Sequence, residues 1–432
     1  MPPTLVAINA ARFAPNVPYK DQWGMIPFVA EAVQGRLNRA LLWQQVNEHR
    51  IPLPRLVVAA LAWASRWDVR YEVAADFVLA LVAALVLVAV VRRTVRPHAP
   101  AVAPWLVPVV SQLTFSLTQG YNWTWGTLMA MDMATLAVAG TAWTLARWDG
   151  GWRGVVTMEA WAMTGALSFG SGLALLWLVG IAILLAPTGA ALPRRLAQAA
   201  VAIAVAGAFG KVYFVGWYPR LGEPPPVFAW AKVPQYTTFV LAYLGGAIGV
   251  RDVAVAARWG MADLVVLAVA AGWLWVTSPR HRAAMLPWLL IEAYGLATAG
   301  LTAFGRLQNG LHVALLARYR PAVAMFAIGV VVVAALAAAH LTTRSGRAGG
   351  AAALMLIAGL ALAAPDHYRG SLDGVSAMRN LDRMLRAGGN CLQSCATATP
   401  QCLLLMCWDA GVARRMCPLM ERFHFGLFAP PR

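Results

Sequence analysis

The sequence predicts an all-α membrane protein, a polytopic transmembrane helical bundle of about 10–11 spans. Hydrophobic residues make up 60% of the 432 positions and charged residues only 12%, with a mean hydropathy of +0.62, which is unlike an ordinary soluble domain. Long, mostly apolar runs such as residues 73–91 and 322–339 are long enough to cross about 30 Å of hydrocarbon as helices. Backbone groups in lipid must bond to one another, so a bundle of helices is expected.

The positive charge of the chain fits this class. The formal net charge is +17, but the arginines are scattered between apolar segments and form no basic domain, which argues against nucleic acid as a partner. Basic loops that set membrane topology, together with contacts to anionic membrane lipid, account for the charge. Many of the 19 tryptophans lie near segment ends, where amphipathic rings favour the membrane interface.

Residues 1–18 are interpreted as the remnant of a first transmembrane helix, because their apolar stretch is too short to span. Residues 19–71 follow as a loop between this remnant and the next span. The loop contains three short amphipathic or apolar segments, at residues 26–33, 37–46 and 56–67. We expect these segments to form interfacial helices that lie along the membrane.

The transmembrane bundle is predicted over residues 72–364. Its spans are expected at residues 72–91, 102–118, 124–146, 154–169, 171–187, 196–216, 260–277, 283–304, 321–339 and 350–364. Short basic loops, such as residues 92–98, alternate with loops that carry no positive charge, such as residues 120–123. The positive-inside rule places the basic set in the cytoplasm.

The order of the spans then decides where the other loops lie. Residues 217–259 must begin and end outside the cytoplasm, so the apolar piece 237–250 is expected to be re-entrant or interfacial. The loop at 19–71, the loop at 305–320 and a tail over residues 365–432 face outward. All five cysteines lie in this tail at spacings that fit zinc poorly, and an oxidising compartment would allow two disulfides with one thiol left over.

Asp21 is the first candidate for chemistry, because it is a carboxylate in the first outward loop, beside a membrane edge. A positioned carboxylate can accept a proton from an acceptor hydroxyl group. The alternative interpretation is an ordinary loop aspartate that pairs with Lys20 or Arg12.

Glu48 and His49 are the second candidates, within the run Asn47-Glu48-His49-Arg50. Either side chain could join Asp21 across the loop as a base, an orienting partner or a metal ligand; a polar helix cap is the alternative. No second histidine or acid stands at the spacing of a metal motif such as HExxH, so no metal site is predicted. No cofactor is expected, although a divalent metal ion stays open as an alternative.

Arg306 and Arg318, with Tyr319 beside the second arginine, lie in the outward loop at 305–320. Guanidinium groups at a membrane surface can hold a phosphate group through paired hydrogen bonds. The alternative is that these arginines extend from helix ends toward water. Arginines in a short outward loop run against the expected charge bias, which favours the functional interpretation.

Two other function classes stay open. Asp132 and Glu292 lie deep in predicted spans, where acids are costly and often line a pathway, so a transporter or flippase of a lipid-linked or small polar substrate is the runner-up. The third class is a non-catalytic membrane scaffold whose Cys-containing tail binds a partner.

An outward Asp-x-Trp followed by amphipathic helices, the segment NEHRIPLPRL, and the later GRLQNG and LLARYRP resemble uncharacterised bacterial multi-pass proteins. Those proteins are similar to the GT-C class of membrane glycosyltransferases, which use polyprenyl-phosphate-linked sugars. The resemblance implies that Asp21, at the position of the acid in the first outward loop, helps to activate the acceptor. It also implies that Arg306 or Arg318, with Tyr319 beside it, holds the lipid phosphate.

The leading hypothesis is therefore a glycosyltransferase in the bacterial inner (plasma) membrane. It would move a sugar from a polyprenyl-phosphate donor to an outward-facing acceptor glycan or lipid. Asp21 would be the base, with Glu48 and His49 in support. Arg306 and Arg318 would stabilise the departing phosphate, which is where negative charge develops.

Overall fold

The computed structural model of the chain describes residues 2–219 and 227–429. In these residues seven helices are long and apolar enough to cross a membrane, so the chain is a multi-pass membrane protein with an all-α fold. The seven are α5 (Arg70–Thr94), α7 (Met129–Leu145), α10 (Leu192–Phe214), α12 (Val253–Thr277), α13 (Pro279–Arg306), α14 (Arg320–Arg344) and α15 (Gly346–Leu392). The 3-10 turn η3 (Gly126–Leu128) lengthens α7 to 20 residues.

All ten intervals predicted as spans contain a helix, but three of these helices are short. They are α6 (Ala103–Thr114), α8 (Trp152–Ser168) and α9 (Gly172–Leu185), with 12, 17 and 14 residues, against about 20 needed for a full crossing. Helix α6 ends where the chain turns into the 3-10 segment η2 (Leu117–Thr124). Helices α8 and α9 are separated by three residues around Gly170.

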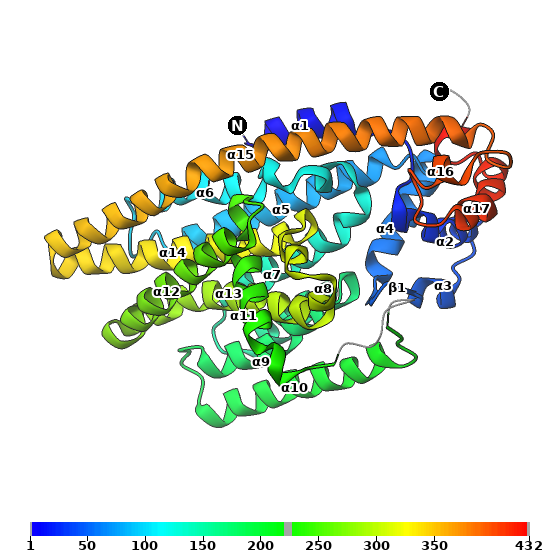
Figure 1. Ribbon diagram of the computed structural model, residues 1–432. Coiled ribbons are helices and arrows are strands. Elements are labelled where there is room, and N and C mark those ends of the chain that lie inside the picture. The colour runs from blue at the N-terminus through cyan, green and yellow to red at the C-terminus, as the bar shows by residue number, and fades with distance from the viewer. Residues whose placement is uncertain (1, 220–226, 430–432) are drawn as a thin grey trace.

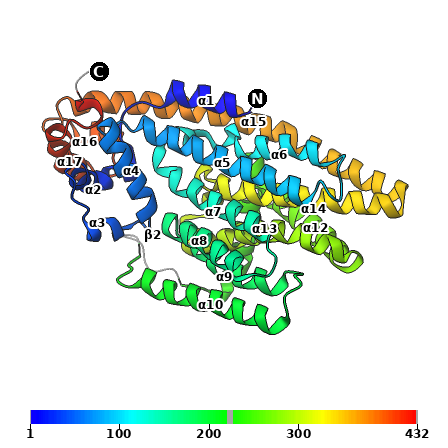
Figure 2. The ribbon, with the colours of Figure 1, turned by 180° about the vertical axis from the view of Figure 1, so that it is seen from behind.

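The long helices α5, α12, α13 and α14 run side by side, and α10 runs along one edge of the bundle (Figure 1). At the opposite edge, α15 extends over the whole length of the molecule, and α1 (Pro2–Phe13) lies beside its second half (Figure 2). The assembly of short elements that follows α15 gathers at one end of the molecule, together with the short helices of the first loop.

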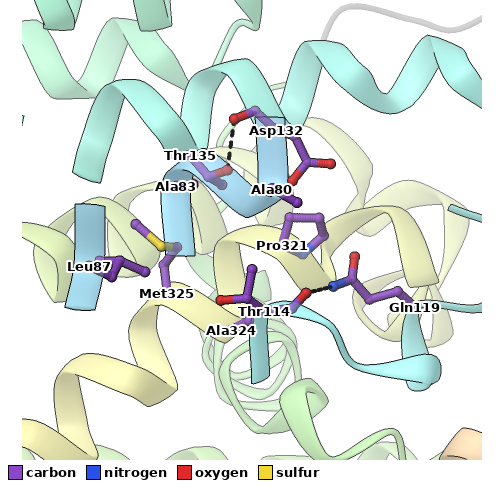
Figure 3. Close-up of a pocket in the computed structure, with 10 residues that line it drawn as sticks. All are labelled: Ala80, Ala83, Leu87, Thr114, Gln119, Asp132, Thr135, Pro321, Ala324 and Met325. Atoms are coloured by element: carbon purple, nitrogen blue, oxygen red, sulfur yellow. Dashed lines mark hydrogen bonds between the residues drawn. The ribbon is translucent and has the colours of Figure 1, made fainter. Parts of the chain in front are cut away.

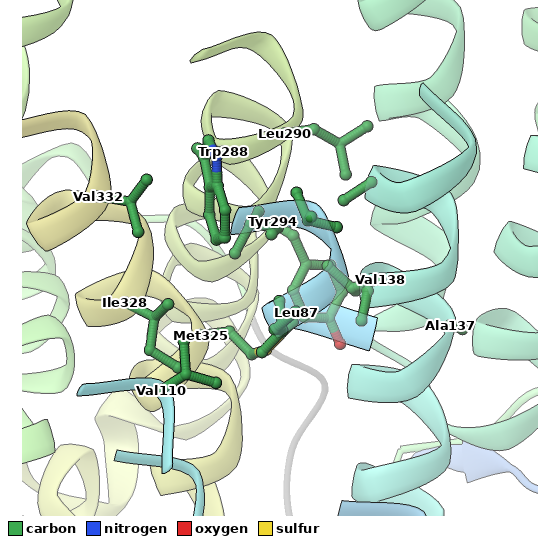
Figure 4. Packing of buried hydrophobic residues seen from close by; sticks show 14 of the residues in the cluster. Leu87, Val110, Ala137, Val138, Trp288, Leu290, Tyr294, Met325, Ile328 and Val332 are labelled. Atoms are coloured by element: carbon green, nitrogen blue, oxygen red, sulfur yellow. The ribbon is translucent and has the colours of Figure 1, made fainter. Parts of the chain in front are cut away.

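A layer of interdigitated side chains from α5, α6, α7, α13 and α14 fills the centre of the bundle (Figure 4). The labelled members of this layer are Leu87, Val110, Ala137, Val138, Trp288, Leu290, Tyr294, Met325, Ile328 and Val332. Each of them is no more than 4% exposed. Lipid does not favour burial of apolar groups as water does, so close packing of these surfaces is what holds the helices together.

The segment 237–250 does not form one of the seven spans. It folds as α11 (Val233–Leu244) and the 3-10 turn η5 (Gly245–Ile248), and α11 runs across the direction of the long helices (Figure 1). Glycines make this crossing possible, because a Cβ on Gly245 would overlap the backbone of Ala256 on α12. The re-entrant or interfacial placement of this segment in the membrane stays a prediction.

The first loop folds into short elements, none of which is long enough to span. They are η1 (Lys20–Met25), α2 (Ile26–Ala32), α3 (Arg39–Trp43), the antiparallel strands β1 (Gln45–Val46) and β2 (His49–Arg50), and α4 (Pro52–Ser65). Pro52 stands at the start of α4, where its missing N–H has no partner to lose. The helices match the three short segments predicted in this loop, whereas the strand pair was not expected.

The helix that contains the predicted span 350–364 is longer than that interval, because α15 continues through Pro365 to Leu392. Its 47 residues correspond to roughly 70 Å of helix. The second half of α15 packs closely on η2, since a Cβ on Gly374 would overlap the carbonyl oxygen of Leu117.

The chain after α15 forms a compact unit, here called the C-terminal cap (residues 391–428). It contains α16 (Pro400–Leu403), α17 (Ala410–Arg422) and the 3-10 turn η9 (Gly426–Phe428). Two disulfides, Cys391–Cys402 and Cys395–Cys417, close it, and Cys407 is a buried thiol. The pairing agrees with the expectation of two disulfides and one remaining cysteine.

Candidate functional site

The β1–β2 hairpin holds Glu48 and His49 in place. Residues Asn47 and Glu48 form its two-residue turn, in which Asn47 has the positive φ of 51° that asparagine tolerates better than most residues. Arg50 then ties the hairpin to the end of α10, because its guanidinium donates hydrogen bonds to the carbonyls of Tyr213 (2.8 Å) and Val215 (2.6 Å). These carbonyls at the helix end would otherwise lack partners.

A buried hydrogen-bond network holds the turn that carries Asp21. Gln22, next to Asp21, accepts from the backbone N–H of Tyr19 (2.8 Å) and donates to Glu72 (2.7 Å). The other carboxylate oxygen of Glu72 accepts from the indole N–H of Trp67 (2.8 Å). Glu72 is fully buried, so both of its hydrogen bonds are needed to offset the cost of removing a carboxylate from water.

The β1–β2 hairpin and the turn that carries Asp21 both open into one cavity of about 1030 Å³. Its polar end is lined by all six residues singled out from the sequence, Asp21, Glu48, His49, Arg306, Arg318 and Tyr319. They come from η1, the hairpin, the end of α13 and the 3-10 turn η8 (Ala317–Tyr319). The structure therefore brings together side chains that lie almost 300 residues apart in the sequence.

Glu48 and Arg306 form the main ion pair of the cavity. The Arg306 Nη2 donates to the Glu48 Oε2 at 2.6 Å, and the two side chains are only 12% and 23% exposed. A charge-assisted hydrogen bond this short in a partly buried place is among the stronger polar contacts in proteins. The Asn47 amide donates to the Asp21 Oδ2 at 3.3 Å, so the hairpin turn contacts both acids.

Arg318 and Tyr319 form the wall next to Asp21. The guanidinium of Arg318 lies 5.2 Å from the centre of the Tyr319 ring, within the range of a cation–π contact. The charge of Asp21 also acts on Arg318. Tyr319 packs in turn on Tyr243 of α11, with ring centres 5.3 Å apart.

His49 packs on the ring of Phe169, near the charges of Arg306 and Arg318. Its imidazole packs on Phe169 with ring centres 4.0 Å apart, and Gly170 leaves room for it, because a Cβ there would overlap the His49 Nδ1. Burial, and then the charges of Arg306 and Arg318, lower the pKa of His49 to about 3. The ring is therefore neutral near pH 7, and at 4.0 Å from Glu48 it does not form a direct hydrogen bond with that carboxylate.

Acid should destabilise the protein through His49. The pKa of His49 is about 3 when folded, against an ordinary value of 6.5, so the unfolded chain binds one more proton between these values. Stability contributed by the neutral ring is thus lost as the pH falls from about 6.5 toward 3, by on the order of 2 kcal/mol at pH 5. Thermal unfolding in detergent at pH 7.5 and pH 5 should show a smaller acid loss for His49→Gln than for the native protein. Equal losses in the two proteins would contradict the prediction.

Several residues of the cavity were not singled out from the sequence. Asn47 contacts Asp21, and the hydroxyl of Tyr294 lies 2.8 Å from that of Ser171 on the cavity wall. Tyr243 and Trp125 also line it. Asn47 belongs to the same polar run of the sequence as Glu48. Tyrosines inside apolar segments, in contrast, have no sequence signal that separates them from core residues.

The two acids behind the transporter hypothesis, Asp132 and Glu292, do not share either of the two cavities described for residues 2–219 and 227–429. Asp132 lines a separate space of about 10 Å³ with Thr135 and Gln119 (Figure 3), which is about the size of one water molecule. A side-chain hydrogen bond connects it to Asp76. Glu292 packs against Gly329 and lines neither of the two cavities described.

Comparison with known proteins gives one similarity. No protein-family model matches the chain, and no curated protein is similar in sequence. Among solved structures, the chain is similar to the crystal structure of ArnT from Cupriavidus metallidurans bound to undecaprenyl phosphate. The match has 14% sequence identity and a TM-score of 0.46, and it covers 92% of this chain and 80% of that chain.

Proposed function

We propose that this protein is a glycosyltransferase of the bacterial inner membrane that moves a sugar from a polyprenyl-phosphate donor to an outward-facing acceptor glycan or lipid. The observation that carries the proposal is the composition of the large cavity. Two acids and two arginines line it, together with many apolar side chains of the helices. This is the combination that an amphiphilic phosphate and a hydroxyl acceptor require.

The apolar end of the cavity suits an isoprenoid chain. Its walls are built by α9, α10 and α13, with Leu173, Trp177, Leu178, Phe214, Leu301 and Phe304 among the lining residues. Trp177 and Phe214 are also 48% and 54% exposed, so other protein groups do not cover this part of the wall, and in the proposal it faces the surrounding lipid. A donor can therefore enter sideways from the bilayer without leaving an apolar environment.

The polar end suits the phosphate. Arg306 reaches the cavity from the end of α13 and Arg318 from the turn η8. Guanidinium groups match the oxygens of a phosphate in geometry and charge. In this proposal Arg318 meets the phosphate directly, while Arg306 is shared between Glu48 and the phosphate. The arginines supply the positive charge at the leaving group, and no cofactor is needed.

Transfer then follows as an inverting displacement. Asp21 accepts the proton of the acceptor hydroxyl, whose oxygen forms a bond to the anomeric carbon of the sugar. The bond between that carbon and the phosphate oxygen breaks, and the phosphate leaves with the electron pair. Asn47 keeps the Asp21 carboxylate oriented through its 3.3 Å hydrogen bond, and the arginines stabilise the charge that develops on the phosphate.

The test is product formation by the purified protein reconstituted into sealed liposomes. The protein is given polyprenyl-phosphate-linked sugars and a membrane extract that contains acceptors, and the lipids are followed by mass spectrometry. We expect free polyprenyl phosphate to accumulate while the sugar appears on an acceptor. If the lipid-linked sugar crosses a sealed bilayer unchanged and no polyprenyl phosphate is released, the transferase proposal fails and the flippase alternative holds.

A further inference from the structure

The C-terminal cap contacts the backbone immediately before Asp21. The N–H of Lys20 donates to the carbonyl oxygen of Met406 at 2.7 Å. Lys20 has a φ of 45°, in the left-handed region that a lysine adopts only at a cost in free energy. Backbone in such a conformation persists where its surroundings hold it, and here the hydrogen bond to the cap contributes to that.

The cap also contacts the chain at Arg66, next to Trp67, which belongs to the hydrogen-bond network that orients Asp21. The N–H of Gly426 donates to the carbonyl oxygen of Arg66 at 3.0 Å. Arg66 and Trp67 have φ values of 56° and 53°, so a second left-handed stretch lies directly under the cap. The Trp67 indole is the group that donates to Glu72, which in turn accepts from Gln22.

A shared core joins the cap to the loop that carries Asp21. Side chains of the loop pack with side chains of the cap in one buried cluster, which includes Trp23, Met25, Ile26, Val29, Met406, Met420 and Phe425. Helix α17 packs on α2 and on η1, and the rings of Trp67 and Phe425 lie 5.7 Å apart. The turn of Asp21 is thus packed between the transmembrane bundle and the cap.

The disulfides determine whether this cap can keep its shape. The cap offers only two short helices and a 3-10 turn, and units this small depend on cross-links because their own cores are small. One disulfide ties the end of α15, at Cys391, to α16, and the other ties the turn just after α15, at Cys395, to α17. In the sequence, Met406 lies between Cys402 and Cys417, the two cysteines that these bonds hold to this part of the chain.

We propose that the disulfide-linked C-terminal cap is a positioning element for Asp21, so that the site is assembled only when both disulfides are formed. A soluble dithiol would reverse this state: it reduces each disulfide to two thiols and is itself oxidised to a disulfide, with two electrons and two protons transferred. The loss of the bridges releases the carbonyl of Met406 and the N–H of Gly426 from Lys20 and Arg66. The effect on catalysis rests on the proposed function, but the effect on the structure of the turn does not.

Hydrogen–deuterium exchange of the purified full-length protein tests the structural step. The variants are Cys391→Ala/Cys402→Ala and Cys395→Ala/Cys417→Ala, with Cys407→Ala as the matched control, since it removes a buried cysteine of the same cap that forms no disulfide. We expect amides in residues 19–25 and 66–72 to exchange at least tenfold faster in the two double variants. Exchange in α13 and α14 should stay unchanged, and Cys407→Ala should stay within twofold of the native protein. Unchanged exchange in residues 19–25 of either double variant would overturn the proposal.

A second measurement separates positioning from general loss of structure. The native protein, folded and already in nanodiscs, is treated with the dithiol, so that no variant has to fold without its bridges. We expect kcat for sugar transfer to fall at least tenfold while KM for the lipid donor stays within threefold. A rise in KM with kcat unchanged would overturn the positioning role. If the native protein transfers no sugar at all, the proposed function fails, and the exchange result still decides the role of the cap.

Discussion

Replacing Asp21 with asparagine should lower the rate of sugar transfer by about 10²–10⁴-fold, the usual contribution of a general base. The two side chains have almost the same shape, so the amide can keep the position next to Asn47, which now donates to the carboxylate. An amide cannot take the proton of the acceptor hydroxyl, however. Binding of the lipid donor should stay within about threefold, because the proposed phosphate contacts are made by arginines and not by this acid.

The control for this substitution is Asp68→Asn. Asp68 is another acid of the first loop, and it pairs with Arg70 at 2.5 Å without lining the cavity. Its substitution should leave transfer within about twofold, because ion pairs near the surface contribute little to stability. Donor binding is measured by titration with polyprenyl-phosphate sugar, and transfer by release of polyprenyl phosphate. An Asp21→Asn protein that transfers sugar at half the native rate or faster would remove the acid from the mechanism.

Asp21 illustrates how much of the site was visible in the sequence. Polar and charged residues stand out in a chain that is mostly apolar, and span counting placed the loop of Asp21 and the loop of Arg306 on the same side of the membrane. The structure has both in one cavity. The pairing of Glu48 with Arg306 joins residues 258 positions apart, and no periodicity or spacing in one sequence encodes a contact at that distance.

Local patterns failed where tertiary packing overrides them. The predicted span ends at residue 364, yet α15 continues to Leu392, and its second half packs on the backbone of η2 at Gly374. Glu72 is the first residue of a predicted span and was not singled out, although it is the buried centre of the network that orients Asp21. The pKa of His49 was equally out of reach, since burial and two distant arginines determine it.

Arg306→Ala should weaken binding of the lipid phosphate and slow transfer together, each by about 10–100-fold, which corresponds to losing a hydrogen bond between charged groups. The side chain has two roles to separate, because it also neutralises Glu48, which is only 23% exposed. If Arg306 only neutralises Glu48, then Glu48→Gln should remove the need for the arginine. The double variant Glu48→Gln/Arg306→Ala should then bind the lipid phosphate as tightly as Glu48→Gln does.

If Arg306 also contacts the phosphate, the double variant should still bind polyprenyl phosphate at least tenfold more weakly than Glu48→Gln. Binding of the uncharged polyprenol should be the same in all of these proteins, since only its apolar chain is recognised. Arg258→Ala is the matched control, because this exposed arginine on α12 bonds only to its own helix backbone among the described residues. The two binding measurements show whether the positive charge of Arg306 acts on the donor phosphate or only on the hairpin that carries His49. Transfer of a sugar from a phosphate requires the first outcome.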